Sequence, residues 1–231
     1  MPYRLQAVPS RLDIENALDF RRLYEYRFAG IDQGARQQVW DVIGPWIHRR
    51  MGSPRRVLDP AAGRFEFLNA VDADERWAVD AVDSGFARRE GISLTVGNAL
   101  EVDLPQGHFD GVFVSHFLEH LATPAHVALL LRRLHRSMSA GGRIAVLGPN
   151  FRYCAAEYFD CADHVLALTH VSVAEHLHAA GFEVSTIIPR FLPFSFRGAL
   201  PPSPALTRAY LRMPAAWRVL GKQLLVVARA A

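Results

Sequence analysis

The sequence predicts an α/β fold, a three-layer sandwich around a mostly parallel, seven-stranded sheet whose last strand is antiparallel. Three observations support this prediction. From residue 54 onward, short apolar runs alternate with helical stretches, as expected of βαβ units around a buried parallel sheet. Two of these helices carry recognisable caps and glycine stops. The chain has 231 residues, half of them hydrophobic, which is enough for one domain with a large core.

Seven segments are expected to be strands. Each is a short run of mostly apolar side chains that lies between helical stretches or turns. In chain order they are RVLD (56–59), WAVD (77–80), SLTVG (93–97), GVFVS (111–115), RIAVLG (143–148), residues 182–188 and residues 224–228.

The N-terminal part of the chain has a helical pattern. Over residues 10–50, apolar side chains recur at three- and four-residue intervals, with interruptions expected near Gly30 and Pro45. The strand-like runs begin only after this segment. We therefore expect an N-terminal helical lid or cap over residues 1–52. A core domain should follow over residues 53–231, with its C-terminal elements on the substrate side.

Two helices of the core are well marked. One is expected to begin after a Thr123 cap and to stop at Gly141–Gly142. The other is expected to begin at Ser172, which can form a capping box with Glu175, and to end at Gly181. Both would pack on the sheet between successive strands.

Composition excludes several classes of protein. The formal net charge is only +3, and the basic residues are dispersed, which disfavours a nucleic-acid substrate. No apolar run approaches the roughly 20 residues that a membrane helix needs, and charges interrupt the first residues where a signal peptide would be apolar. The two cysteines, Cys154 and Cys161, do not form a close metal-type pair. We therefore expect a soluble, cytoplasmic protein that contacts neither membrane nor nucleic acid.

The loop after the first strand suggests a nucleotide-type site. Asp59 ends the strand, and Ala61, Ala62 and Gly63 are small enough to let the backbone approach a ligand. Asp80 follows about twenty residues later, at the end of the second strand, where a carboxylate can bind both hydroxyls of a ribose. Together these features favour an adenosine-type cofactor over an ordinary strand-to-helix turn.

Five motifs carry a family resemblance that covers about residues 55–150. In their order and spacing they resemble the successive motifs of class I S-adenosylmethionine-dependent methyltransferases, which implies a Rossmann-like fold and S-adenosyl-L-methionine as the cofactor. NAD-binding domains share the first two motifs but seldom the later ones. The motifs are RVLDPAAGRFEF, WAVDAVD, TVGNALEVDLP, FDGVFVSHFLEHL and MSAGGRIAVLGPN.

The resemblance also implies a set of cofactor-binding residues. They are the glycine-rich loop residues Asp59, Ala61, Ala62 and Gly63, the ribose-binding acid Asp80 with its neighbour Ala81, the adenine-contacting pair Asn98 and Ala99, and Ser115 and His116 beside the cofactor on the acceptor side.

The loop departs from the family pattern at several positions. Pro60, Ala61 and Phe65 stand where the family often has Leu, Gly and Gly, and Asn98 replaces the more usual Asp. Ala61 can replace glycine only if its backbone avoids positive φ. The amide oxygen of Asn98 can still accept a hydrogen bond from the adenine amino group.

The predicted function is methyl transfer from S-adenosylmethionine to a small-molecule acceptor, such as a sugar, a nucleoside or another polar metabolite. Two alternatives stay open, an NAD-dependent oxidoreductase and a non-catalytic cofactor-binding module. An oxidoreductase would need a tighter glycine loop than PAAGRF offers, whereas a non-catalytic module would result if the altered loop had lost affinity.

Histidines near the fourth strand offer two further hypotheses. His116 could serve as the base that removes a proton from a hydroxyl acceptor, or it could simply pack or bond a backbone carbonyl. The pattern HFLEH (116–120) also matches a zinc motif in which Glu119 would activate water. We expect no metal, because the sequence suggests no third ligand downstream. His120 is expected to be structural, and residues 163–170 supply other candidates that could roof the pocket.

Two segments could close over the site. LYEYRF (23–28) could act as a lid, with Arg27 or Tyr26 reaching the cofactor's carboxylate, or it could pack at the sheet edge. Aromatic residues after the fifth strand could line an acceptor pocket, or half of them could fill the core. They are Phe151, Tyr153, Tyr158 and Phe159.

Overall fold

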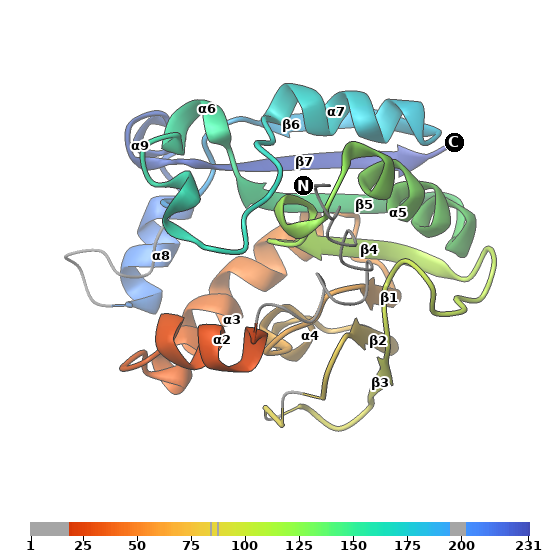
Figure 1. Cartoon of the computed structure of the whole chain (residues 1–231), viewed down its shortest axis with the longest axis horizontal. Helices are drawn as coiled ribbons and strands as arrows, with labels where there is room; N and C mark the ends of the chain where they lie inside the picture. The colour runs from red at the N-terminus through yellow and green to blue at the C-terminus, as the bar shows by residue number, and fades with distance from the viewer. Residues whose placement is uncertain (1–18, 84, 87, 195–201) are drawn as a thin grey trace, which may run out of the picture.

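The computed structural model describes residues 19–83, 85–86, 88–194 and 202–231. A seven-stranded sheet of order β3-β2-β1-β4-β5-β7-β6 forms its centre (Figure 1). Only β7 runs antiparallel to its neighbours, β5 and β6, so the predicted number and direction of the strands are confirmed. The strands are β1 Arg56–Asp59, β2 Glu75–Asp80, β3 Ile92–Val96, β4 Phe109–Ser115, β5 Met138–Pro149, β6 Phe182–Ile188 and β7 Gln223–Ala230.

Helices cover both faces of the sheet and give three layers. On one face, α5 (Pro124–Ser137) and α7 (His170–Ala179) bury their apolar sides (Figure 1). Four helices contribute to the apolar layer on the other face, namely α3 (Gln33–Arg50), α4 (Glu66–Ala70), α8 (Pro204–Leu211) and α9 (Pro214–Leu220). The remaining helical elements are α2 (Phe20–Arg27), α6 (Phe151–Cys154), and the 3₁₀ turns η1 (Leu118–His120) and η2 (Tyr158–Asp160).

The central strands are buried on both sides, which explains their continuous apolar runs. In β4, Val112 and Val114 pack into the layer that contains α5, whereas Phe113 between them packs into the layer that contains α3. Successive side chains of a strand point to opposite faces, so both faces need an apolar residue where helices cover both. The loops that leave the carboxyl ends of these strands therefore start from a rigid edge.

Two helices, α3 and α5, differ from the sequence prediction. α3 continues through Pro45 without a break. α5 ends at Ser137 rather than at Gly141–Gly142, because Met138 already pairs with Phe109 in the sheet. The glycines instead lie within β5, where a Cβ on Gly142 would come within 3.0 Å of a backbone carbonyl oxygen.

The start of α7 is also corrected. The helix begins at His170, two residues before the predicted Ser172. Its N-cap is Thr169, whose hydroxyl accepts from the Ser172 amide at 3.2 Å, while the Ser172 hydroxyl accepts from the Thr169 amide at 2.9 Å. Ser172 thus forms a capping box with Thr169 and not with Glu175.

The N-terminal helices are described from residue 19 onward, so the part of the predicted helical segment before it lies outside the described residues. A turn at residues 28–30 separates α2 from α3, as expected near Gly30. α3 buries Trp40, Ile43 and Ile47 in the same apolar layer as β1. The division of the chain into a 1–52 cap and a 53–231 core stays a prediction.

Candidate active site

Backbone amides of the loop after β1 donate hydrogen bonds that shape the loop and hold it against the end of β2. The amide of Ala61 donates to Asp59 Oδ1 at 3.1 Å, and the amide of Ala62 donates to the Val79 carbonyl at 3.0 Å. The amide of Gly63 then donates to Asp80 Oδ2 at 2.7 Å. Three of the sequence-predicted residues, Asp59, Gly63 and Asp80, therefore meet at the carboxyl edge of the sheet, where ligands of doubly wound folds bind.

The loop after β3 joins this edge. The amide of Gly97 donates to the Asp80 carbonyl at 2.8 Å, which brings the next residue, Asn98, beside the β2 end. The exposed Asn98 side chain accepts from the Leu100 amide at 3.0 Å and donates to Glu101 at 3.0 Å. An amide oxygen can accept a second bond, so this oxygen keeps capacity for a ligand donor.

Backbone strain is concentrated in the two loops that flank the expected cofactor. Among the described residues, the non-glycine residues with positive φ are Ser53, Phe65 and His116. Phe65 (φ 60°) lies in the loop after β1, and His116 (φ 48°) directly follows β4. Such backbone conformations cost about 1–3 kcal/mol each and cluster at functional sites. Ala61 is absent from this group, so it meets the condition under which alanine can replace glycine.

Asp59 is a buried carboxyl group, and no cation among the described residues compensates its charge. Its burial raises its pKa to about 7, and the negative charges of Asp80 and Glu66 act in the same direction. The hydrogen bond from Ala61 opposes this shift only in part. A carboxyl group that is costly to ionise is consistent with a site that awaits a positively charged ligand.

His116 lies between β4 and η1, and its Nδ1 is 2.9 Å from the Ser115 hydroxyl. Burial of the ring lowers the pKa of His116 to about 3, and the charges of Arg36 and His120 add to this effect. The imidazole is therefore neutral near pH 7. It can accept a hydrogen bond there, but it is a weak base.

α2 lies over the same edge and is tied to a loop far along the chain. The Arg27 guanidinium forms two hydrogen bonds with the buried Asp163 carboxylate. The pKa of Tyr24 is raised to about 12. Burial is the largest cause, and the negative charges of Asp163 and Asp80 act in the same direction. Tyr26, the other predicted lid residue, is 82% exposed. Sequence reasoning missed Tyr24 and the ion pair of Arg27, because neither contact is local.

The loop residue Arg64 was also missed by the sequence prediction. Its guanidinium lies 3.9 Å from the centroid of the Phe28 ring and 4.6 Å from that of Phe86. These contacts place cation–π pairs directly beside Gly63. No signal in the sequence pairs these three residues, although an arginine in a small-residue loop is itself unusual enough to note.

The aromatic residues that follow β5 divide into two groups. Tyr158 is fully buried, and its hydroxyl donates to the Leu166 carbonyl, so it belongs to the core. Tyr153 is half-buried and stacks on His170 at 6.2 Å, while Phe159 is 57% exposed. Of the four predicted aromatics, Tyr158 thus fills the core, and Phe151, Tyr153 and Phe159 reach the surface of this segment.

Two cavities on the described surface lie away from the carboxyl edge of the sheet. One cavity lies between α3 and α8, at Trp46 and Arg208, and another lies beside Gly52 and Arg143. Neither contains a residue of the expected cofactor loops. Among the described residues, no helix has the length and apolar character needed to cross a bilayer.

Comparison with known proteins agrees with this geometry. Residues 52–146 match the methyltransferase domain family. A comparison with curated protein sequences found no match.

Solved structures with a similar fold cover most of the chain. A SAM-dependent methyltransferase from Archaeoglobus fulgidus superposes with a TM-score of 0.62 at 21% identity, covering 91% of this chain and 100% of that one. The partner of the Trm112 methyltransferase activator in a complex from Haloferax volcanii gives 0.64 at 18% identity, covering 89% and 95%. A SAM-dependent methyltransferase from Mesorhizobium loti gives 0.54 at 17% identity, covering 82% and 99%.

At these identities the likeness to solved structures is one of fold, and the family match supplies the activity. The family match and these neighbours indicate S-adenosylmethionine as the cofactor. Residues 52–146 therefore form a methyltransferase domain, and the fold of the chain is that of solved S-adenosylmethionine-dependent methyltransferases.

Proposed function

We propose that the enzyme transfers the methyl group of S-adenosylmethionine to a polar small molecule. The observation that carries the proposal is the hydrogen bond of Gly63 to Asp80, which joins the small-residue loop to the carboxylate at the end of β2. This arrangement leaves Asp80 Oδ1, already in contact with the Val82 amide at 3.3 Å, on the side where a ribose would lie.

The cofactor residues have separate roles in this proposal. Ala61, Ala62 and Gly63 let the backbone approach the methionine part, and Asp80 with Ala81 holds the ribose. Asn98 and Ala99 contact the adenine, while Ser115 and His116 lie beside the methyl group. Asp59 balances positive charge, because a cation near a buried carboxyl lowers the pKa that burial has raised to about 7.

The chemistry asks little of the protein beyond alignment. S-adenosylmethionine supplies a methyl group on a positively charged sulfur. For the methyl group to pass to a lone pair of the acceptor as the carbon–sulfur bond breaks, the enzyme would have to hold the attacking atom in line with that bond. His116 is the proposed base. Its neutral imidazole can take the acceptor's proton as the bond forms, which suits an acceptor that becomes acidic only during the reaction.

α2 supports the proposal of a lid over the cofactor. The charge of Asp80, the proposed ribose-binding acid, contributes to the raised pKa of Tyr24, so this helix lies near the proposed ribose site. The Arg27–Asp163 ion pair would then act as the latch of the closed state. Arg27 bonds Asp163 in this closed arrangement, so the latch replaces the predicted contact of Arg27 with the cofactor's carboxylate.

A small molecule is favoured over a macromolecule as the acceptor. The net charge of +3 is weak, and a nucleic-acid substrate would call for a concentrated basic face. The half-buried Tyr153 and the exposed Phe159 combine with nearby polar groups in the segment after β5, as small-molecule sites do.

Calorimetry tests the cofactor, and labelled methyl groups test the acceptor. We expect saturable binding of S-adenosylhomocysteine and none of NAD. Binding of NAD alone would favour the oxidoreductase alternative, and binding of neither would favour a non-catalytic module. For the acceptor, the enzyme is incubated with methyl-labelled cofactor and either a fraction of small metabolites or total RNA. Label in the RNA fraction alone would overturn the small-molecule proposal.

A further inference from the structure

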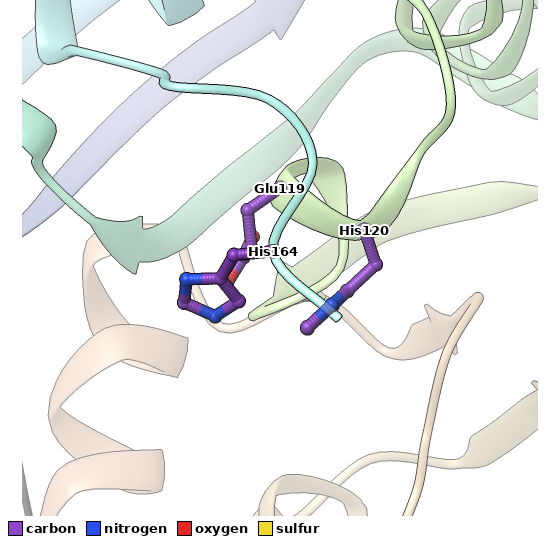
Figure 2. Close-up of side chains that lie close together, drawn as sticks. All are labelled: Glu119, His120 and His164. Carbon is purple, nitrogen blue, oxygen red and sulfur yellow. The ribbon is translucent and has the colours of Figure 1, made fainter. Parts of the chain in front are cut away.

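Three potential metal ligands meet beside the proposed acceptor site. Glu119 and His120 belong to η1, which follows β4, and His164 lies in the loop before α7. One ligand atom from each of the three lies within 4.8 Å of the others. Figure 2 shows the three side chains gathered between the η1 turn and the His164 loop.

We propose that Glu119, His120 and His164 together bind one divalent transition-metal ion of the zinc type. The proposal goes beyond methyl transfer and does not depend on it, because metal binding is measured directly.

Two of the three side chains have buried atoms that lack a protein partner. Oε1 of Glu119 and Nδ1 of His164 are both buried without a hydrogen bond. Glu119 is only 2% exposed, so water does not readily satisfy its carboxylate. Buried polar atoms are nearly always paired, and a site for a bound ion is one of the standard reasons for an exception.

The third side chain, that of His120, keeps one ring nitrogen available as a ligand. His120 Nδ1 lies 2.9 Å from the Asp163 carbonyl oxygen. A carbonyl oxygen can only accept, so Nδ1 carries the proton and Nε2 is left with a free lone pair. A ligating histidine typically has its other ring nitrogen fixed in this way.

The backbone holds the two segments together without help from a metal. The Glu119 carbonyl accepts from the amides of Val165 at 2.8 Å and Leu166 at 3.0 Å, which anchors the loop that carries His164. The carboxylate of Asp163 is in turn fixed by Arg27 from α2. The donors are therefore positioned by contacts that do not consume them.

The observed spacing requires a small adjustment on binding. Ligand atoms about 2.0–2.2 Å from a tetrahedral zinc ion lie roughly 3.3 Å from one another. The proposal therefore requires the Glu119 or His164 side chain to move closer to the others on metal binding, since their ligand atoms lie up to 4.8 Å apart. The imidazole rings of His120 and His164 already lie against each other, with their centroids 5.0 Å apart.

The donor set selects the class of metal. Two imidazoles and one carboxylate suit Zn²⁺, Co²⁺ or Fe²⁺, whereas Mg²⁺ and Ca²⁺ prefer oxygen ligands alone. Three protein ligands leave a coordination position open to water or to an oxygen of a small molecule.

This site differs from the zinc hypothesis that the sequence raised. The HFLEH pattern pairs His116 with His120 and keeps Glu119 as a base, and the absence of a third ligand argued against a metal. In the fold, His116 Nδ1 contacts Ser115 instead, and His164 takes the place beside Glu119. The third ligand is supplied by a segment that the pattern does not include.

Cobalt titration of the full, tag-free chain tests the proposal. The purified protein is stripped with a chelator and titrated with Co²⁺, whose visible absorption reports the ligand geometry, and Zn²⁺ is then added as a competitor. We expect one Co²⁺ per chain, displaced by Zn²⁺, and a higher melting temperature with Zn²⁺ than without. Absence of saturable Co²⁺ binding to the wild-type chain overturns the proposal.

Variants separate this site from adventitious surface binding. Glu119→Gln, His120→Gln and His164→Gln should each weaken Co²⁺ binding at least about tenfold, the lower end of losses seen for metal-supporting residues. The matched control is His178→Gln, an exposed histidine of α7, which should bind as the wild type does. Glu119→Gln is isosteric, so it decides the question if a histidine variant does not fold. Unchanged binding in Glu119→Gln rejects the site.

Discussion

The backbone amide of Gly63 donates a 2.7 Å hydrogen bond to the carboxylate of Asp80. This bond joins two loops that leave neighbouring strands, β1 and β2, whose parallel pairing aligns Asp59 with Ala78. Asp80 thus has two functions in the proposed mechanism, since it shapes the small-residue loop and would bind the ribose. The predictions for Asp80 and Gly63 depend on that double role.

Replacing Asp80 by alanine should weaken binding of S-adenosylhomocysteine by about 1–3 kcal/mol, the scale of losing hydrogen bonds to a charged group. Isothermal titration calorimetry measures the change. Asp74→Ala is the control, because Asp74 is exposed at the start of β2 and pairs only with the exposed Arg55. An affinity of the Asp80 variant equal to that of the control would place the ribose elsewhere.

Glycine 63 can be tested against a glycine with the same backbone and no proposed role. Gly63 has φ 51° and Gly107 has φ 62°, and a Cβ on either would meet no atom within 4 Å. Alanine at each position should therefore cost a similar conformational strain, about 1 kcal/mol of unfolding free energy by urea denaturation. Only Gly63→Ala should also weaken cofactor binding. Equal cofactor affinity in the two variants would show that the loop backbone does not approach the ligand.

The strands could be predicted from the sequence because their signal is local. The apolar runs at the centres of β1, β4 and β5 are continuous since helices cover both faces of these strands. Helix ends were predicted less well. α3 continues through Pro45, and α5 ends before Gly141–Gly142, because packing and sheet pairing outweigh local preferences there.

The site could be predicted only where its residues share one motif region. Asp59, Gly63 and Asp80 follow neighbouring strands, so their spacing along the chain indicates their meeting point. The Arg27–Asp163 pair instead joins residues 136 positions apart, and no local pattern relates them. For the same reason, His164 could not be recognised as a neighbour of Glu119.

Asp59 should make the stability of the ligand-free enzyme depend on pH. Its pKa rises from an ordinary value near 3.8 to about 7 in the fold, so the folded state binds the proton that the unfolded state releases between these values. Its favourable contribution is complete below the unfolded pKa and is lost as pH rises through 7.

Asp59→Asn removes the charge while keeping an oxygen that can accept from Ala61. The variant should therefore match the wild type near about pH 4 and become more stable than it at about pH 8, by up to roughly 4 kcal/mol at the linkage limit. Urea denaturation at both pH values measures this, with Asp74→Asn as the exposed control. A stability difference that does not change with pH would contradict the buried-carboxyl account.

Arg27→Gln should release α2 from the edge of the sheet. Although burial opposes it, the hydrogen bonds and charge of Arg27, with the charge of His120, hold the pKa of Asp163 below its ordinary range. Removing the guanidinium leaves a buried carboxylate without its main partner, at a cost of about 1–3 kcal/mol near neutral pH. This cost should shrink as pH falls and Asp163 becomes protonated.

If α2 is the lid, S-adenosylhomocysteine should also dissociate roughly tenfold faster from the Arg27→Gln variant, the change that 1.4 kcal/mol produces. Stopped-flow displacement measures the rate, and Arg22→Gln on the exposed side of the same helix serves as the control. Equal dissociation rates in the two variants, with α2 still helical, would mean that the Arg27–Asp163 pair supports the fold and does not retain the cofactor.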